Sequence, residues 1–204
     1  TDRTFLEIEE IHKIQHLKLR ARNPLYDARE VFLFECYTGI RISDILTLKW
    51  KHITDEKISI RMRKTEKLLT IPINDYVRSV LDRRRCAVEN NGGKITSEKY
   101  VFNILKVDVD EVSAQDALNA ISSATAVINK QLKKIAEQTN IDKNLSTHCA
   151  RHSYATALLT NNIPLPVIKE MLGHSDIKVT QIYAKVVDSK RNEVVECLNK
   201  VYHG

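Results

Sequence analysis

The stretch STHCARHSYATALLTNNIPLPVIKEMLGHSDIKVTQIY, residues 146–183, is the part of this chain around which the rest is organised. It places His148 and Arg151 three residues apart, then a Gly-His pair at 173–174, then Tyr183 nine residues beyond that second histidine. A helix is expected to begin just before His148, and a helix N-terminus offers free N–H groups and a dipole that favour an anion. The order and helical setting of these residues therefore indicate polar groups gathered around one phosphate.

Thr147 is expected to cap the first helix of this stretch, which puts His148 in its first position and Arg151 in its fourth. Residues three apart lie on one face of a helix, so both side chains can reach one small target. His148 and His152 also have the i, i+4 spacing of a zinc pair. The residues between them, however, lack the glutamate that a zinc protease needs and include an arginine that would repel a cation. We therefore expect a phosphate here and no metal.

A second helix is expected to begin at Pro164 and to end at Gly173, because proline suits the first helical turn and glycine suits the residue after the last one. His174 then lies in a turn that holds its ring in one direction. The last element brings Tyr183 to the same region. A tyrosine hydroxyl has a pKa of about 10, so as a nucleophile at neutral pH it needs a base and nearby positive charge.

Upstream of this stretch, the spacing of apolar residues predicts helices over most of the chain. Residues 4–7 match a capping box for a first helix, and the Asn-Pro pair at 23–24 begins a second, which Gly39 ends. Arg41 follows at a helix-turn-helix corner, and Asp44 lies in the short helix after it. The sequence thus predicts that Arg41 is held by a rigid corner.

Between residues 49 and 73 the apolar period changes to two, which predicts a β-hairpin. With an earlier strand near residues 48–53, the fold class is α+β: mainly helical with a small three-stranded antiparallel sheet. Further helices are expected after Asn74 and Ser113. The polar side and tip of the hairpin carry Arg61, Arg63, Lys64 and Lys67. These charges keep an exposed sheet edge from aggregating, or they reach a phosphate backbone.

Composition places the chain among ordinary globular domains with a basic balance. The 204 residues have a net charge of +6 and a pI of about 9.1, which is consistent with a polyanionic partner such as nucleic acid. No apolar run has the length of a membrane span. Four widely spaced cysteines without a CxxC pair favour reduced thiols in a cytoplasmic protein. Nucleotide hydrolysis and α/β-hydrolase chemistry have no support, because a P-loop and a GxSxG elbow are both missing.

Several short motifs, taken together, resemble the catalytic domain of tyrosine recombinases, the phage integrase family. They are Thr38-Gly-Ile-Arg41 followed by Asp44, Lys64-Thr65 in a basic hairpin, His148-x-x-Arg151-His152, Leu172-Gly173-His174 and Tyr183. His-x-x-Arg alone would mean little. The joint order and spacing of these elements, over almost the whole chain, make the resemblance specific.

The resemblance implies a role for each matched residue. Tyr183 corresponds to the nucleophile that attacks a DNA phosphodiester and becomes joined to the 3′-phosphate. Arg41 and Arg151 correspond to the pair that holds the non-bridging oxygens, where charge grows in the transition state. Lys64 corresponds to the general acid that protonates the departing 5′-oxygen. His148 helps to manage the tyrosine proton.

The remaining implied residues support this set. His174 corresponds to a second histidine that hydrogen-bonds the phosphate. The supporting positions are Asp44, Thr147, His152 and Gly173, and the expected DNA contacts are Arg61, Arg63 and Lys67. The resemblance implies no metal or cofactor, since two arginines, a lysine and two histidines supply the base and the positive charge. It implies no ATP either, because a phosphotyrosine link retains the energy of the phosphodiester bond.

We interpret residues 1–204 as a single catalytic domain, with a core at 1–185 and a tail helix at 186–204. The tail either docks onto a neighbouring protomer or packs onto its own domain. We expect the core-binding and arm-binding domains that usually precede this domain in the family to lie outside residues 1–204. The expected partners are double-stranded DNA and further protomers, as a tetramer across two sites, with no membrane.

The expected function is site-specific recombination for integration or excision of a mobile element such as a transposon, in a bacterial cytoplasm at the nucleoid. Two alternatives remain open. A type IB topoisomerase-like enzyme shares the chemistry but relaxes supercoils. A DNA-binding module without activity would need DNA contacts but not the complete set of Arg41, Arg151 and Tyr183.

Overall fold

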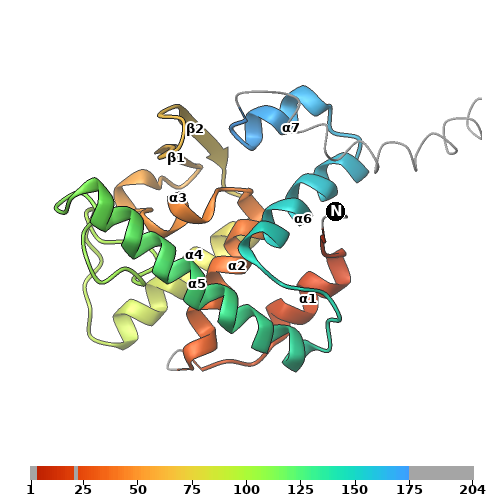
Figure 1. The fold of residues 1–204 in the computed structure, drawn as a ribbon, viewed down its shortest axis with the longest axis horizontal. Helices are drawn as coiled ribbons and strands as arrows, with labels where there is room; N and C mark the ends of the chain where they lie inside the picture. Colours follow the sequence, from red (N-terminus) through yellow and green to blue (C-terminus); the bar gives the residue numbers. More distant parts are fainter. Residues whose placement is uncertain (1–3, 21–22, 175–204) are drawn as a thin grey trace, which may run out of the picture. The chain divides into compact units, whose positions relative to one another are not determined.

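The computed structural model of the chain describes residues 4–20 and 23–174 (Figure 1). Two compact units make up the chain, Thr1–Tyr154 and Ala155–Gly204, and each is described by itself. Tyr183 and the tail helix predicted at 186–204 lie outside the described residues. None of the helices in the described part combines the length and the apolar character needed to cross a membrane.

The described part is mainly helical with one small sheet, as predicted. In chain order its elements are α1 Ile8–His16, α2 Pro24–Thr38, α3 Ile42–Leu46, the 3-10 helix η1 Trp50–His52, β1 Lys57–Arg61, β2 Leu68–Pro72, α4 Asp75–Asn90, α5 Ala114–Thr139, α6 Thr147–Thr160 and α7 Leu165–Met171. The first unit contains the elements up to α5 and the beginning of α6.

Helix α2 forms the core of the first unit. Twelve of its 15 residues are buried, so the helix is covered on almost all sides. It packs against α1, α4 and α5, and α5 runs alongside it (Figure 1). Phe32 and Phe34 are fully buried, and Phe34 meets Phe102 edge to face with 5.2 Å between the ring centroids. The corner at the end of α2 therefore rests on the best-packed part of this unit.

The local signals for helix ends are largely confirmed. Asn23 caps α2, Asn74 caps α4 and Ser113 caps α5, each through a side-chain oxygen that accepts a backbone N–H. Gly39 ends α2 in the left-handed conformation, with φ 65°, and its N–H donates to the Glu35 carbonyl at 2.8 Å. Helix α5 is one continuous helix of 26 residues.

The prediction of a third strand was wrong. Only β1 and β2 pair in the described part, antiparallel and with Ile58 opposite Ile71. The segment near 48–53 forms η1 and a single bridge to β1. Its backbone groups bond elsewhere, because the Trp50 N–H donates to the Lys99 carbonyl at 3.0 Å and the Lys51 N–H donates to the Ser97 carbonyl at 2.8 Å.

The predicted start of the first helix was also wrong. Helix α1 begins at Ile8, and Glu7 rather than Thr4 caps it. The Glu7 N–H donates to the Glu10 carboxylate at 2.8 Å, which completes a capping box three residues later than expected. The Leu6 N–H is used by a distant residue, since it donates to the Ser153 hydroxyl at 2.8 Å.

Candidate active site

The corner between α2 and α3 fixes Arg41. The Thr38 hydroxyl donates to the Phe34 carbonyl at 2.7 Å and accepts the Ile40 N–H at 3.2 Å, so the backbone before Arg41 is tied to α2. Arg41 itself precedes α3 as its N-cap residue. Its half-buried guanidinium lies 3.3 Å from the Met62 sulfur, at the base of the hairpin turn. The prediction of a rigid corner is confirmed.

Asp44 joins this corner to the hairpin. It is buried, and one carboxylate oxygen accepts the Arg63 N–H at 2.9 Å. The other oxygen is buried without a hydrogen-bond partner among the described residues. Burial raises the pKa of the Asp44 carboxyl, and the Arg63 N–H and the positive charges of Arg41 and Arg151 reduce that rise. The positive charges of both arginines thus act on the Asp44 carboxyl, which also bonds to the backbone of Arg63, the residue next to Lys64.

Arg151 reaches the same corner from α6. Its side chain is buried, and its Nη1 donates to the Gly39 carbonyl, two residues before Arg41. Its charge also acts on the buried carboxyl of Glu35. Burial raises the pKa of this carboxyl well above its usual value, and the charge of Arg151 offsets only part of that rise. The structure therefore brings Arg151, which is more than a hundred residues away in the sequence, to the corner that carries Arg41 and Asp44.

The N-terminus of α6 presents His148 to solvent, but its cap is not the predicted one. Ser146 caps the helix: its hydroxyl accepts the Cys149 N–H at 3.2 Å. Thr147 is the first helical residue, and its N–H donates to the side-chain oxygen of Asn129 on α5 at 3.0 Å. Thr147 is buried and its hydroxyl has no partner among the described residues. The three-residue spacing of His148 and Arg151 is unaffected.

The hairpin turn carries an exposed basic cluster. Arg61, Arg63, Lys64 and Lys67 are all exposed. The turn is closed by the Met62 N–H, which donates to the Lys67 carbonyl at 2.9 Å, and by Arg61, whose guanidinium donates to the Glu66 carbonyl at 2.7 Å. In the sequence Lys64 lies inside the turn that these two bonds close, and it forms no ion pair with the described residues. Its amine is accessible.

The remaining predicted residues fall into different parts of the chain. His152 is half-buried on α6 in the first unit. Gly173 and His174 belong to the second unit, where Gly173 has φ 61° and ends α7 as predicted. The Gly173 N–H donates to the Glu170 carbonyl at 2.8 Å, and the His174 N–H donates to the Lys169 carbonyl at 3.0 Å. His174 is thus fixed in the predicted turn within its own unit.

The arrangement suits an anion. The guanidinium groups of Arg41 and Arg151 lie at one corner beside the buried carboxyl of Asp44, and Lys64 lies on the hairpin that Asp44 joins to this corner. Guanidinium groups are permanent cations with a fork of N–H donors that matches phosphate oxygens. Among residues 4–20 and 23–174, no three or more histidine, cysteine or acidic side chains form a group that could hold a metal ion.

Two residues at this site were missed by sequence reasoning. Glu35 is a carboxyl in the apolar run of α2, and a charged residue in such a run needs a partner, which could have directed attention to it. Ser146 was passed over in favour of its neighbour Thr147, since both carry a hydroxyl. The contact between Thr147 and Asn129 that decides between them is not visible in a local pattern.

Comparisons with known proteins give one consistent answer. The profile of the phage integrase family matches residues 4–190. The tyrosine recombinase XerD of Halalkalibacterium halodurans is 31% identical over 191 residues, which are 93% of this chain and 59% of that protein. The integrase of Staphylococcus phage L54a is 26% identical over 216 residues, with 98% of this chain and 60% of that protein covered. The chain spans about three fifths of the length of these relatives.

Solved structures show the same fold. The crystal structure of XerA recombinase has a TM-score of 0.68 at 22% identity, with 95% of this chain and 64% of that chain covered. The catalytic domain of bacteriophage HP1 integrase has a TM-score of 0.59 at 24% identity, with 96% of this chain and 95% of that chain covered. XerH recombinase in a post-cleavage complex with a palindromic difH substrate has a TM-score of 0.67 at 23% identity, with 94% of this chain and 52% of that chain covered.

Proposed function

From the premise that this chain belongs to the phage integrase family, we propose that it is the catalytic domain of a tyrosine site-specific recombinase. The observation that carries the proposal is the meeting of Arg41 and Arg151 at one corner, where Arg151 donates to the Gly39 carbonyl. Two buried or half-buried guanidinium groups at one point have a clear use if a phosphodiester lies between them. The substrate is double-stranded DNA.

Arg41 and Arg151 bind the non-bridging oxygens of the scissile phosphate. Charge on these oxygens increases in the transition state, so donors that are already oriented stabilise it more than the ground state. Both donors are held before DNA binds, because the Arg41 guanidinium contacts the Met62 sulfur and the Arg151 guanidinium donates to the Gly39 carbonyl. Positioning of this kind needs no metal ion or cofactor.

Proton transfer is assigned to the more exposed residues. Tyr183 attacks the phosphorus and becomes joined to the 3′-phosphate, while the bond to the 5′-oxygen breaks. Lys64 donates a proton to that leaving oxygen, and His148 accepts the tyrosine proton. His174 donates a hydrogen bond to the phosphate. The free 5′-hydroxyl of a partner strand later attacks the phosphotyrosine bond and releases Tyr183 without ATP.

The exposed residues Arg61, Arg63 and Lys67 contact the DNA backbone beside the cleaved bond. They flank Lys64 on the hairpin turn, so the same contact would hold Lys64 near the leaving group. Backbone contacts of this kind are independent of sequence and weaken as salt is added. Asp44, Thr147, His152 and Gly173 are supporting residues that help to position the catalytic side chains.

At the level of the whole assembly, we propose one catalytic domain at 1–204 whose tail helix, 186–204, docks onto a neighbouring protomer. Four protomers act on two DNA sites, at the nucleoid of a bacterial cytoplasm. The biological outcome is the integration or excision of a mobile element. One relative, from Staphylococcus phage L54a, is named an integrase, which supports integration as this outcome.

A covalent capture experiment tests the proposal. The full chain is incubated with a library of nicked duplexes whose central base pairs are randomised, so that cleavage releases a short strand and traps the enzyme. We expect an adduct that survives denaturant and is joined to a 3′-phosphate, with enrichment of particular sequences. Relaxation of supercoiled plasmid without any enriched sequence would instead favour a topoisomerase-like enzyme. Binding without an adduct would favour an inactive DNA-binding module.

A further inference from the structure

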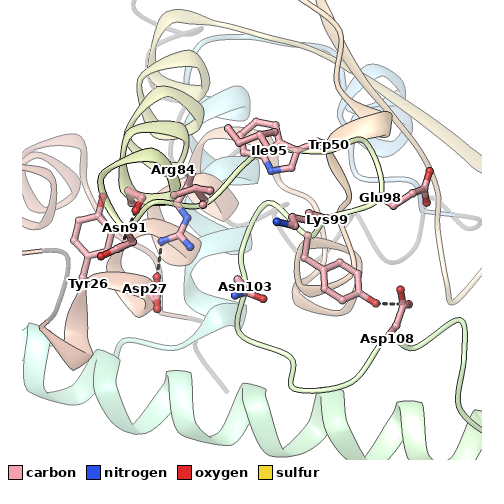
Figure 2. Close-up of a pocket in the computed structure, with 14 residues that line it drawn as sticks. Tyr26, Asp27, Trp50, Arg84, Asn91, Ile95, Glu98, Lys99, Asn103 and Asp108 are labelled. Atoms are coloured by element: carbon pink, nitrogen blue, oxygen red, sulfur yellow. Dashed lines mark hydrogen bonds and ion pairs between the residues drawn. The ribbon is translucent and has the colours of Figure 1, made fainter.

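A second hollow lies in the first unit, between α2, η1, α4 and the segment that follows α4 (Figure 2). Its volume is about 530 Å³, within the range of about 300–1,000 Å³ that is typical of small-molecule sites. None of the residues that line it belongs to the proposed active site. The recombinase reaction gives this hollow no role.

Aromatic rings provide the apolar walls. Trp50 and Tyr26 line the hollow, and each is 7% exposed. The Trp50 backbone is fixed by its N–H, which donates to the Lys99 carbonyl at 3.0 Å, and the Arg85 guanidinium lies 5.2 Å from the indole centroid. Figure 2 shows Trp50 and Ile95 at the top of the hollow and Asn103 near the bottom. Because both side chains are almost completely covered, each offers only a small apolar surface to a ligand in the hollow.

The turn after α4 closes one side of the hollow. Gly93 approaches Val88 so closely that a Cβ atom would lie 2.9 Å from the Val88 Cγ1. The Gly93 N–H donates to the Val88 carbonyl at 2.9 Å, which folds the chain back onto the end of the helix. Glycine at this position therefore shapes the wall, since a side chain would push the segment away.

The carboxylates that line the hollow are already neutralised. They form the ion pairs Asp27–Arg84, Glu98–Lys51 and Asp108–Lys49. Lys99, in contrast, is exposed, and its amine donates to the Lys94 carbonyl at 2.8 Å and has no acidic partner among the described residues. The lining thus has no unpaired negative charge to attract a cation and has one amine available to an anion.

Two amide side chains offer hydrogen bonds to the edge of a ring. The Asn91 amide nitrogen donates to the Ala87 carbonyl at 2.7 Å, so its oxygen is left to accept. Asn103 is exposed, and its amide has no hydrogen-bond partner in the part of the chain that the structure describes. Amides that present a donor and an acceptor match the mixed edge of a nucleobase.

We propose that this hollow is a mononucleotide site. The base meets the small exposed parts of Trp50 and Tyr26, its edge bonds to Asn103 and Asn91, and the phosphate lies at Lys99. The inference goes beyond the proposed recombinase function and does not depend on it, because the two sites share no residue.

Trp50 makes the test direct, since it is the one tryptophan of the sequence and lines the hollow. The full chain is titrated with AMP, GMP, CMP and UMP while indole fluorescence is excited at the red edge of its absorption. We expect a saturable change with at least one of them. The corresponding nucleoside should bind about tenfold more weakly, through loss of the Lys99 contact, and ribose 5-phosphate should give no change.

Matched variants locate the site. Asn103→Ala and Lys99→Met should each weaken binding of the preferred nucleotide about tenfold. The controls Asn144→Ala and Lys106→Met remove exposed residues that do not line the hollow and should leave binding unchanged. A saturable signal in none of the four titrations would overturn the proposal, as would equal weakening by pocket and control variants.

Discussion

The two arginines at the α2–α3 corner and the lysine at the hairpin tip are held in opposite ways. Arg151 is buried and donates to the Gly39 carbonyl, whereas Lys64 is exposed and its turn is joined to the corner through the Arg63 N–H and Asp44. A group that stabilises charge gains from being fixed in advance. A group that delivers a proton must reach the leaving oxygen of a bound DNA strand. The comparison predicts that the corner contributes to both stability and catalysis, and the tip to catalysis alone.

The largest expected effect is on the rate of DNA cleavage when Lys64 at the hairpin tip is replaced. Lys64→Ala should slow single-turnover cleavage by about 10²–10⁴-fold, as loss of a general acid does, with no change in the free energy of unfolding. A substrate with sulfur in place of the 5′-bridging oxygen should restore most of the rate, because a thiolate leaves without a proton.

Lys67→Ala is the matched control for Lys64, since both lysines are exposed on the same turn. It should weaken DNA binding and flatten the salt dependence, but leave the rate of bound substrate unchanged. A rate loss in Lys67→Ala that the sulfur substrate rescues would transfer the role of general acid to Lys67.

The next effect, at the corner, should appear in two measurements. Arg151→Ala should lower the cleavage rate by about 10²–10³-fold, the usual cost of removing one transition-state donor. It should also lower the free energy of unfolding by about 1.5–3 kcal/mol, because the buried Gly39 carbonyl loses a charged donor. Single-turnover cleavage measures the change in rate, and chemical denaturation measures the change in the free energy of unfolding. Arg151→Lys keeps the charge but not the fork, and should recover only part of each.

The buried carboxyl beneath the corner gives a prediction about pH. Burial raises the pKa of Glu35, so the folded state keeps the proton at pH values where the unfolded chain has lost it. The contribution of Glu35 to stability is therefore greatest at low pH and falls as pH rises above about 4.5, by at most about 1.4 kcal/mol per unit. Denaturation of Glu35→Gln from pH 4 to 7 should lack this contribution. An unchanged pH dependence in the variant would show that Glu35 is not its source.

The smallest effect comes from the glycine that makes the corner. Gly39→Ala should cost about 1–2 kcal/mol, because φ is 65° at this position. Gly92 is the control: it has φ 72°, and a Cβ atom there would meet no other atom within 4 Å, so alanine should cost a similar amount. Cleavage should slow in Gly39→Ala, whose backbone carries the acceptor for Arg151, and stay unchanged in Gly92→Ala.

The same contrast explains what could be predicted from the sequence. Asn23, Gly39 and Gly173 act on their own neighbours, so their caps and turns follow from local patterns. The family resemblance named Arg41, Lys64 and Arg151. The structure adds the contact of Arg151 with the Gly39 carbonyl.

The errors came from contacts between distant segments. The expected strand at 48–53 uses its backbone groups on residues 97–101. The cap of α6 is Ser146, and the N–H of Thr147 bonds to Asn129 on α5. Glu35 was overlooked because its partner charge, Arg151, comes from more than a hundred residues away. The partners in these contacts do not follow from a local pattern, although a charged residue in the buried run of α2 indicates that Glu35 has one.

The central claim concerns the atom that becomes joined to DNA, and mapping that atom tests it most directly. The trapped adduct is digested with protease and nuclease, and the peptide that retains a nucleotide is sequenced by mass spectrometry. The account predicts a phosphodiester on Tyr183, and no adduct from Tyr183→Phe although that variant still binds the enriched DNA. A nucleotide on any other residue, or an undiminished adduct from Tyr183→Phe, would contradict it.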